Sequence, residues 1–533
     1  MHNEISASSL LTGCEIFQGV SSIKKNTESI RQIYNSIKTS YGPHGFDKMC
    51  VDASGMVSIT NDGATILKNI LVDDPAAKLM VNLSLEQDKE VGDGTTSVVL
   101  LAYNLIERGC KLILEGVHPS VVVSGYRMAF NESIKYIKEK MGKRINIKQD
   151  KKVIENIINT CISSKIIYQE KELFTNITLS CLENVHENGK YATERISILK
   201  SIGGSIKESM FYNGCILNCS VASQLMQKSL KNPKILCLDF SLSREKLPLT
   251  VSINVSDPEK LEKIRSEEVL MTKNKCQAII DSGATLVFLT GGLDEMVIKM
   301  FIDSGVVAVR RCLKSDLASI AASTGTVLLK SIVGDDNEYH VDSFGTCEQF
   351  EVKQLGEYEL CYISGCKQNM STVLIRGPNS QIVEEVERSL NDSIQILKRT
   401  MESKNIVPSG GSVESALSFL LEDFSAKINL KEHISIFAYS DALLEIPKIL
   451  AANAGLNSNK LVSELLSCQW EAYMSGNYDK FYGLDVVKGV VQDNFEHGIV
   501  EPTIYKLKAL KLATEAAISV LRINEIIVFP SKK

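Results

Sequence analysis

The stretch EQDKEVGDGTTSVVLLAYNLIERG, residues 86–109, joins an acidic segment to an apolar one through the loop GDGTT. Residues 97–109 are apolar nearly all round a helical wheel, which predicts a helix that is buried on several sides. Glycines leave backbone N–H groups accessible, and the start of a helix favours anionic oxygens. The stretch therefore predicts a loop and a helix start that can bind phosphate.

Side chains in the same loop add suitable chemistry. Asp93 offers a hard carboxylate oxygen, which suits an Mg²⁺ ion that bridges phosphate oxygens. Thr95, Thr96 and Ser97 add hydroxyl donors. A turn at Asp93-Gly94 followed by a threonine helix cap would look the same, so that alternative stays open.

The composition indicates a large globular protein. Its 533 residues correspond to about three domains of roughly 100 to 200 residues each. Hydrophobic residues make up 44% and charged residues 23%, so long disordered segments are not expected. The formal charge of -5 gives no overall attraction to nucleic acid or to an anionic membrane, and neither is expected as a partner.

The sequence shows no signal for a membrane span, for export or for zinc. Its longest apolar runs, such as VVLLA at 98–102, are far shorter than the roughly 20 residues that cross a bilayer. The start, MHNEISASSLLTG, lacks the basic and apolar regions of a signal peptide, so a cytoplasmic location is expected. The 14 cysteines form no CxxC pair, which favours buried thiols over zinc sites or disulfides.

Helical patterns dominate the first part of the chain. Ile30, Ile33, Tyr34 and Ile37 recur at the spacing of an amphipathic helix, which stops at Gly42-Pro43. Behind that helix, apolar residues alternate with polar ones around a turn signal at 52–55, which predicts a short hairpin. Further helices are predicted over 119–140 and 151–163.

The middle of the chain differs from its two ends. Strand-like runs at 234–240, 285–290 and 305–310 alternate with helical segments, which predicts an α/β module. Helical patterns return from about residue 380, and a final strand is predicted at 523–529. Helical ends around an α/β middle suggest an insertion, but periodicity does not reveal which ends touch.

The predicted helix at 381–403 carries an unusual polar group. Its apolar face consists of Val383, Val386, Leu390, Ile394 and Leu397. Asn391, Asp392 and Ser393 lie off that face and are poor helix formers in mid-helix. Such local inconsistency tends to mark a working site, although a solvated polar face would look the same.

Other segments are weaker signals by themselves. The glycines of SYGPHG (40–45) and PSGGSVESAL (408–417) permit close backbone approach, and plain loops would look the same. By spacing alone, Asp62, Lys165 and Glu501 are expected to be exposed surface charges. The P-loop, dinucleotide, zinc-protease and hydrolase motifs are missing from the sequence.

Six segments, taken in order, resemble the signatures of group II chaperonins. They are GPHGFDKM (42–49), NDGATIL (61–67), QDKEVGDGTTSV (87–98), SSK (163–165), VPSGGSVE (407–414) and GIVEPT (498–503). Within that family, HPSVVVSGYR (118–127) and LATEAAISVLRI (512–523) most resemble the alpha-subunit branch of the eukaryotic cytosolic complex, CCT or TRiC. The resemblance spans nearly the whole chain.

The resemblance implies a multidomain α+β chaperonin fold. A mainly helical equatorial ATPase domain would take residues 1–145 and 403–533. A small α/β intermediate domain would take 146–212 and 367–402, and an α/β apical, substrate-binding domain would take 213–366. The segment DPEKLEKIRSEEV (257–269) resembles the start of the family's helical lid protrusion, with Asp257 as cap and Pro258 as first helical residue. A plain surface helix is the alternative.

The resemblance also implies a complete ATP site. Its nucleotide-binding residues would be Gly42, Pro43, Gly94, Thr95, Thr96, Ser97, Ser164, Lys165, Gly410, Gly411, Glu501 and Lys506. Asp93 would ligate Mg²⁺, and Asp392 would orient or deprotonate the attacking water with support from Asp62. Ser409, Asn391 and Tyr41 depart from the family pattern, and Ser409 puts nucleotide affinity, rather than chemistry, in question.

The implied function is ATP-driven protein folding in a hetero-oligomeric double ring of paralogous subunits. Unfolded client proteins of the actin and tubulin type would be the substrates, and the ATP cycle would close and open the chamber. A structural ring subunit that binds ATP but hydrolyses it weakly is one alternative. A free-standing phosphotransferase, monomeric or dimeric, is another.

Overall fold

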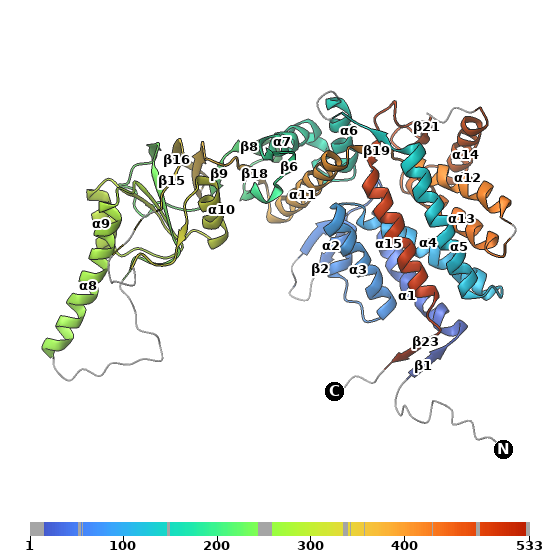
Figure 1. Cartoon of the computed structure of the whole chain (residues 1–533), viewed down its shortest axis with the longest axis horizontal. Coiled ribbons are helices and arrows are strands. Elements are labelled where there is room, and N and C mark those ends of the chain that lie inside the picture. Colours follow the sequence, from blue (N-terminus) through green and yellow to red (C-terminus); the bar gives the residue numbers. More distant parts are fainter. Residues whose placement is uncertain are drawn as a thin grey trace, which may run out of the picture. The chain divides into compact units, whose positions relative to one another are not determined.

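The computed structural model describes residues 15–51, 55, 57–146, 150–243, 258–333, 339, 341, 343–356, 358–428, 430–475 and 480–528. The chain divides into two compact units (Figure 1). The first unit contains both ends of the chain, Met1–Thr175 and Glu384–Lys533, and the second contains Asn176–Val383. The middle of the chain is therefore an insertion between two segments that fold together.

The first unit is mainly helical. Its helices are α1 (Val20–Lys38), α2 (Gly63–Asn69), α3 (Pro75–Val91), α4 (Thr95–Leu114), α5 (Pro119–Tyr136), α6 (Lys151–Ile162), α12 (Ser412–Lys427), α13 (His433–Asn453), α14 (Ser458–Met474) and α15 (Thr503–Leu521). Short turns follow α5 at Ile137–Met141 and α6 at Ile166–Glu170. Helix α7 (Lys171–Asn184) begins in this unit, and α11 (Ser380–Ser403) ends in it.

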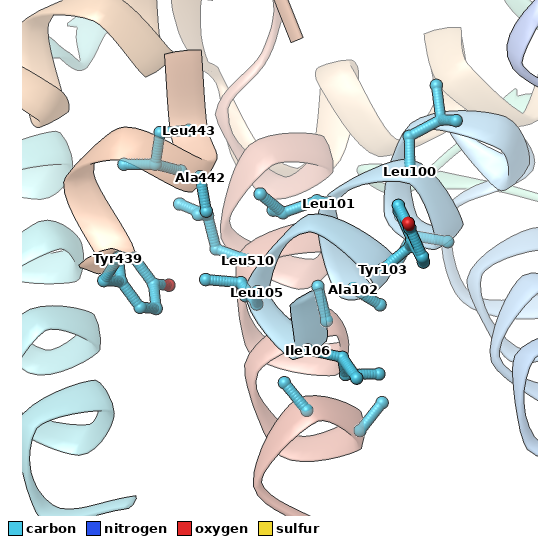
Figure 2. Close-up of a cluster of buried hydrophobic side chains, with 14 of the residues drawn as sticks. Leu100, Leu101, Ala102, Tyr103, Leu105, Ile106, Tyr439, Ala442, Leu443 and Leu510 are labelled. Atoms are coloured by element: carbon cyan, nitrogen blue, oxygen red, sulfur yellow. The ribbon is translucent and has the colours of Figure 1, made fainter. Parts of the chain in front are cut away.

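Helix α4 is the centre of this unit, as its apolar sequence predicted. It packs against α1, α3, α13 and α15, and residues 95–106 are all buried. Figure 2 shows Leu101 and Leu105 of α4 facing Ala442 of α13 and Leu510 of α15. An apolar helix without a polar face requires such neighbours on several sides.

Short strands connect distant parts of the first unit. β1 (Glu15–Gln18) pairs antiparallel with β23 (Glu525–Val528), which joins the two chain ends (Figure 1). A three-stranded sheet has the order β22-β19-β4, with β4 at Lys143–Arg144, β19 at Asn405–Pro408 and β22 at Val500–Pro502. The predicted hairpin is β2 (Lys48–Val51) with β3 (Val57–Thr60), and a second hairpin joins β20 (Tyr482–Asp485) to β21 (Val490–Asp493).

The α/β module predicted from the middle of the chain is confirmed in the second unit. Its parallel sheet has the order β13-β12-β11-β14. The strands are β11 (Lys234–Leu238), β12 (Leu286–Leu289), β13 (Val307–Val309) and β14 (Leu328–Leu329), with β15 (Gly345–Thr346) antiparallel to β11. The helices are α8 (Pro258–Asp281), α9 (Glu295–Asp303) and α10 (Lys314–Thr324).

Two further sheets complete the second unit. The antiparallel sheet β10-β16-β17-β9 consists of Ser229–Lys231, Gln349–Leu355, Tyr358–Ser364 and Cys215–Leu217. The mixed sheet β7-β18-β8 consists of Ile196–Ile202, Ser371–Gly377 and Met210–Asn213. Small elements are β5 (His186–Glu187), β6 (Lys190–Tyr191) and the turns Thr193–Arg195 and Ile206–Glu208.

The predicted multidomain α+β fold is confirmed, while its finer division into equatorial, intermediate and apical segments stays a prediction. Helix α8 starts at Pro258, as predicted, and the expected cap Asp257 lies outside the described residues. The described cysteines are free thiols, ten of them buried. In the described part of the chain, no helix combines the length and apolar character that crossing a bilayer requires.

Helix α11 confirms one prediction and corrects another. The five residues predicted for its apolar face are buried. Asn391 is exposed and Asp392 partly exposed, as expected, but the expectation for Ser393 is wrong. Ser393 is buried because its hydroxyl donates to Ser389 O (2.8 Å), which satisfies the polar group inside the helix.

Candidate functional site

A cavity of about 850 Å³ lies in the first unit. Its lining includes every site residue predicted from the sequence: Gly42, Pro43, Asp62, Asp93, Gly94, Thr95, Thr96, Ser97, Ser164, Lys165, Asp392, Gly410, Gly411, Glu501 and Lys506. The volume is typical of sites for small molecules and cofactors. Residues from loops, helix ends, the middle of α11 and the strand β22 thus meet at one place, although their individual roles stay predictions.

The GDGTT loop reverses the chain between α3 and α4. Gly92 ends α3 and Gly94 precedes α4, both with left-handed backbones (φ 85° and 80°). No described side chain caps the start of α4. Asp93 accepts a hydrogen bond from Gly94 N through Oδ1 (2.6 Å), and Gln87 Nε2 donates to Asp93 O (3.1 Å). The loop therefore presents a helix start with free N–H groups beside a carboxylate.

The hydroxyls of Thr95 and Ser97 already have partners in the protein. Thr95 Oγ1 donates to Asp62 Oδ1 (2.9 Å). Ser97 Oγ donates to Gly94 O (3.0 Å) and lies 2.9 Å from the Tyr505 hydroxyl. Backbone N–H groups and the Thr96 hydroxyl, rather than these two hydroxyls, are therefore the donors that remain for an anion at this loop.

Asp62 has a structural role that spacing did not predict. Its carboxylate caps α2 by accepting from Ala64 N (3.3 Å) and Thr65 N (2.9 Å). Together with the bond from Thr95, this cap ties α2 to the start of α4. Asp62 therefore helps to position the GDGTT loop.

Lys165 and Asp392 form an ion pair on the cavity wall. The side chain of Lys165 is 7% exposed and that of Asp392 is 21% exposed. Burial raises the pKa of the Asp392 carboxyl to about 8, because Lys165 only partly offsets burial and the negative charges of Asp62 and Asp93. Burial acts to lower the pKa of Lys165, but the carboxylates of Asp392 and Asp93 outweigh it and raise that pKa.

A second charged group lies at another part of the wall. Glu501 Oε2 lies 3.1 Å from Lys506 Nζ, and Glu414 Oε1 lies 2.9 Å from the same nitrogen. Ser409 donates its hydroxyl to Glu501 Oε1. Burial raises the pKa of Glu501, and the charge of Lys506 opposes this rise.

The expectation of exposed surface charges, made from spacing alone, is wrong for Lys165 and Glu501. Their side chains are only 7% and 19% exposed. Both charges are buried because each has a partner of opposite charge from a distant part of the chain. Glu414 and Tyr505 contact site residues but were not predicted from the sequence. Acidic residues in the first turn of a helix and tyrosines within helices are common, so neither gave a signal.

The glycine pair at 410–411 is required by protein neighbours. Gly410 and Gly411 have left-handed backbones (φ 70° and 76°). A Cβ on Gly410 would lie 2.4 Å from Leu484 O, and one on Gly411 would lie 2.7 Å from Pro447 Cβ. The loop therefore packs tightly on β20 and α13 while its open side lines the cavity.

The donor set fits a nucleotide with magnesium better than a metal held by protein alone. Among the described residues, no group of three or more His, Cys, Asp or Glu side chains could hold a metal ion. Mg²⁺ commonly takes one or two carboxylates and completes its shell with phosphate oxygens and water. Asp93, beside an uncapped helix start, suits that arrangement.

Comparison with known proteins identifies the family. Residues 33–530 match the model of the TCP-1/cpn60 chaperonin family. T-complex protein 1 subunit alpha from Encephalitozoon cuniculi is 52% identical, over 99% of both chains. The subunit of the same name from Schistosoma mansoni is 41% identical over 98% of both chains, and thermosome subunit alpha from Aeropyrum pernix is 34% identical over 97% of this chain and 93% of its own. As its six sequence segments predicted, the chain belongs to the TCP-1/cpn60 chaperonin family, among its group II members, and it resembles their T-complex protein 1 alpha subunits.

Proposed function

We propose that this chain is a chaperonin subunit that binds and hydrolyses Mg-ATP to drive the folding of other proteins. The observation that carries the proposal is the Lys165–Asp392 pair on the wall of the cavity that also contains the start of α4. A buried cation, a carboxylate with a raised pKa and an uncapped helix start together suit phosphoryl transfer, which needs positioning and charge stabilisation.

The phosphates would lie at the GDGTT end of the cavity. The backbone N–H groups of Thr95, Thr96 and Ser97 would bind phosphate oxygens, and Gly94, which has no side chain, would let the phosphates approach the loop closely. Gly42 and Pro43 would approach from the loop after α1, and Ser164 with Lys165 would reach the terminal phosphate. Mg²⁺, held by Asp93, would neutralise charge on the phosphate oxygens.

Asp392 would act on the attacking water. It would orient the water and accept its proton while the water oxygen bonds to the terminal phosphorus and the bond to the ADP oxygen breaks. The products are ADP and inorganic phosphate. Lys165 would stabilise the charge that develops on the phosphate, and Asp62 would hold the α4 loop in place.

The nucleoside would lie at the other end. Gly410 and Gly411 would border the adenine, because the loop has no side chain there. Glu501 would accept hydrogen bonds from the ribose, and Lys506 would hold Glu501.

The relatives are named as subunits, and we extend this to the present chain. It would assemble with paralogous subunits into a cytoplasmic, hetero-oligomeric double ring that encloses unfolded clients, with actin- and tubulin-type proteins expected. Contacts between ATP and Asp392 would favour the closed chamber, and loss of the terminal phosphate would release it. Neither nucleic acid nor a membrane is needed in this scheme.

Replacing the proposed base tests the proposal. Asp392→Ala in the assembled particle is expected to keep ATP binding and to slow hydrolysis by roughly 10²- to 10⁴-fold. Glu402→Ala is a matched control, because Glu402 lies on the same helix but is exposed and pairs only with Arg399 among the described residues. Unchanged turnover in Asp392→Ala would show that the base is misassigned. Wild-type particles that bind ATP but do not hydrolyse it at this subunit would favour a structural subunit.

A further inference from the structure

Ser409 lies between β19 and the glycine pair, and its backbone is fixed on both sides. Its N–H donates to Ile499 O (3.0 Å), and its carbonyl accepts from Asn494 Nδ2 (2.7 Å). The residue is buried and lines the cavity. These two hydrogen bonds fix the position of the Ser409 backbone and therefore of its Cβ. From this position the hydroxyl donates to Glu501 Oε1.

Glu501 is consequently held at both of its carboxylate oxygens. Ser409 binds Oε1, while Lys506 Nζ lies 3.1 Å from Oε2. Lys506 is itself fixed by Glu414 Oε1 at 2.9 Å, and its side chain is only 5% exposed. With Lys506 alone, Glu501 could still turn about that single contact. The second contact from Ser409 sets the plane of the carboxylate.

Glu501 lines the cavity, where its Oε2 atom is buried beside Lys506 and makes no hydrogen bond among the described residues. An ionised carboxylate accepts at about four lone-pair positions, and the described contacts use two of them. Two hydroxyls on neighbouring carbons can donate to one correctly oriented carboxylate, and such charge-assisted bonds are strong and directional. A sugar with a vicinal diol matches this acceptor better than one that lacks either hydroxyl.

We propose that Ser409 is a positioning residue that orients Glu501 toward the 2′- and 3′-hydroxyls of a ribose, so that the site selects ribonucleotides over deoxyribonucleotides. This inference rests on the proposed function, since it requires a nucleotide in the cavity. It gives the serine, which replaces a glycine of the family pattern, a role in sugar selection.

The test compares the binding of three nucleoside diphosphates: ADP, 2′-deoxy-ADP and 3′-deoxy-ADP. Diphosphates are used because they lack the terminal phosphate that the site would hydrolyse. Calorimetric titration of the purified full-length chain is expected to show roughly tenfold tighter binding of ADP than of either deoxy form. Ser409→Ala should reduce that preference to roughly twofold, chiefly by weakening ADP. Ser409→Thr keeps a hydroxyl and should keep the preference for ADP. Glu501→Gln should lose that preference, and it tests the inference even if Ser409→Ala does not fold.

Ser418→Ala is the matched control. Ser418 is buried on the neighbouring helix α12, its hydroxyl has no hydrogen-bond partner among the described residues, and it is not part of the cavity wall. Equal weakening of all three nucleotides by Ser409→Ala, or an unchanged preference, would overturn the inference and assign the serine to packing. A wild-type chain that binds the three alike would overturn the inference alone. A wild-type chain that binds none would contradict the proposed function as well.

Discussion

Gly92 is a residue at which the GDGTT loop closely approaches helix α11. Its backbone is left-handed (φ 85°), and a Cβ there would lie 2.5 Å from Gln395 Cβ of α11. Asp392 lies one turn earlier on that helix. Gly92→Ala is therefore expected to displace Asp392 and to lower ATP turnover by roughly 10²-fold, as a displacement of about 1 Å can do. Steady-state ATPase assays of the particle measure this.

A control separates displacement from backbone strain. Gly116 is also left-handed (φ 99°), but a Cβ there would meet no atom within 4 Å. Gly116→Ala should therefore lower stability by about 1 to 2 kcal/mol, the usual cost of a left-handed alanine, without changing turnover. Equal turnover in Gly92→Ala and Gly116→Ala would refute the role of the close approach.

The raised pKa of Asp392 predicts an unusual pH dependence. A general base works in its ionised form, so turnover should fall as the pH drops through the pKa of about 8 rather than through the ordinary carboxylate range. Lys165 opposes the rise, so Lys165→Met should move the acidic limb of kcat/KM to higher pH. Profiles of kcat/KM between about pH 6 and about pH 10 test this. A limb that stays in place or moves to lower pH would count against Asp392 as the titrating base.

The site could be predicted residue by residue only through the family resemblance. Spacing alone predicts that Lys165 and Glu501 are exposed charges, because their partners of opposite charge, Asp392 and Lys506, are set by tertiary packing. Ser409 was noticed as a departure from the family pattern. Its hydrogen bond to Glu501 could not be foreseen, since β19 and β22 must first pair to bring the two residues together.

At the scale of elements, Lys506 joins α15 to β22 and α12. It lies between Glu501 and Glu414 with a 5% exposed side chain. Lys506→Met would leave two carboxylates buried without their cation, which is expected to cost about 3 to 5 kcal/mol of unfolding free energy. Urea unfolding of the purified chain measures the loss.

Lys508→Met is the control on the same helix. Lys508 pairs with Glu90 near the surface, where both side chains are over a third exposed, so this change should cost far less. Adding Glu414→Gln and Glu501→Gln to Lys506→Met should recover much of the loss, because no net charge then remains buried. Equal destabilisation by the two lysine variants would contradict the bridging role.

Elements with local signals were predicted well. The all-round apolar pattern identified α4, and period and length identified α11 and the strands β11, β12 and β13. The partner of the last strand could not be predicted. β23 pairs with β1 about 500 residues earlier, and nothing in a four-residue strand specifies which other strand it will meet.

At the scale of the whole molecule, the β2–β3 hairpin is the surface at which assembly can be tested. Met49, Val51, Val57 and Ile59 lie on one face, since Met49 is opposite Ile59 and Val51 opposite Val57, and they are 38 to 67% exposed. We expect a neighbouring ring subunit to cover this face.

The double change Val51→Lys and Ile59→Lys should therefore leave the chain near its own 58.8 kDa, whereas the wild type should sediment in a much larger particle. Val490→Lys, at a valine of β21 that is 44% exposed, should still assemble. A double variant that enters the particle normally would refute the role of the hairpin, and a monomeric or dimeric wild type would instead favour a free-standing phosphotransferase.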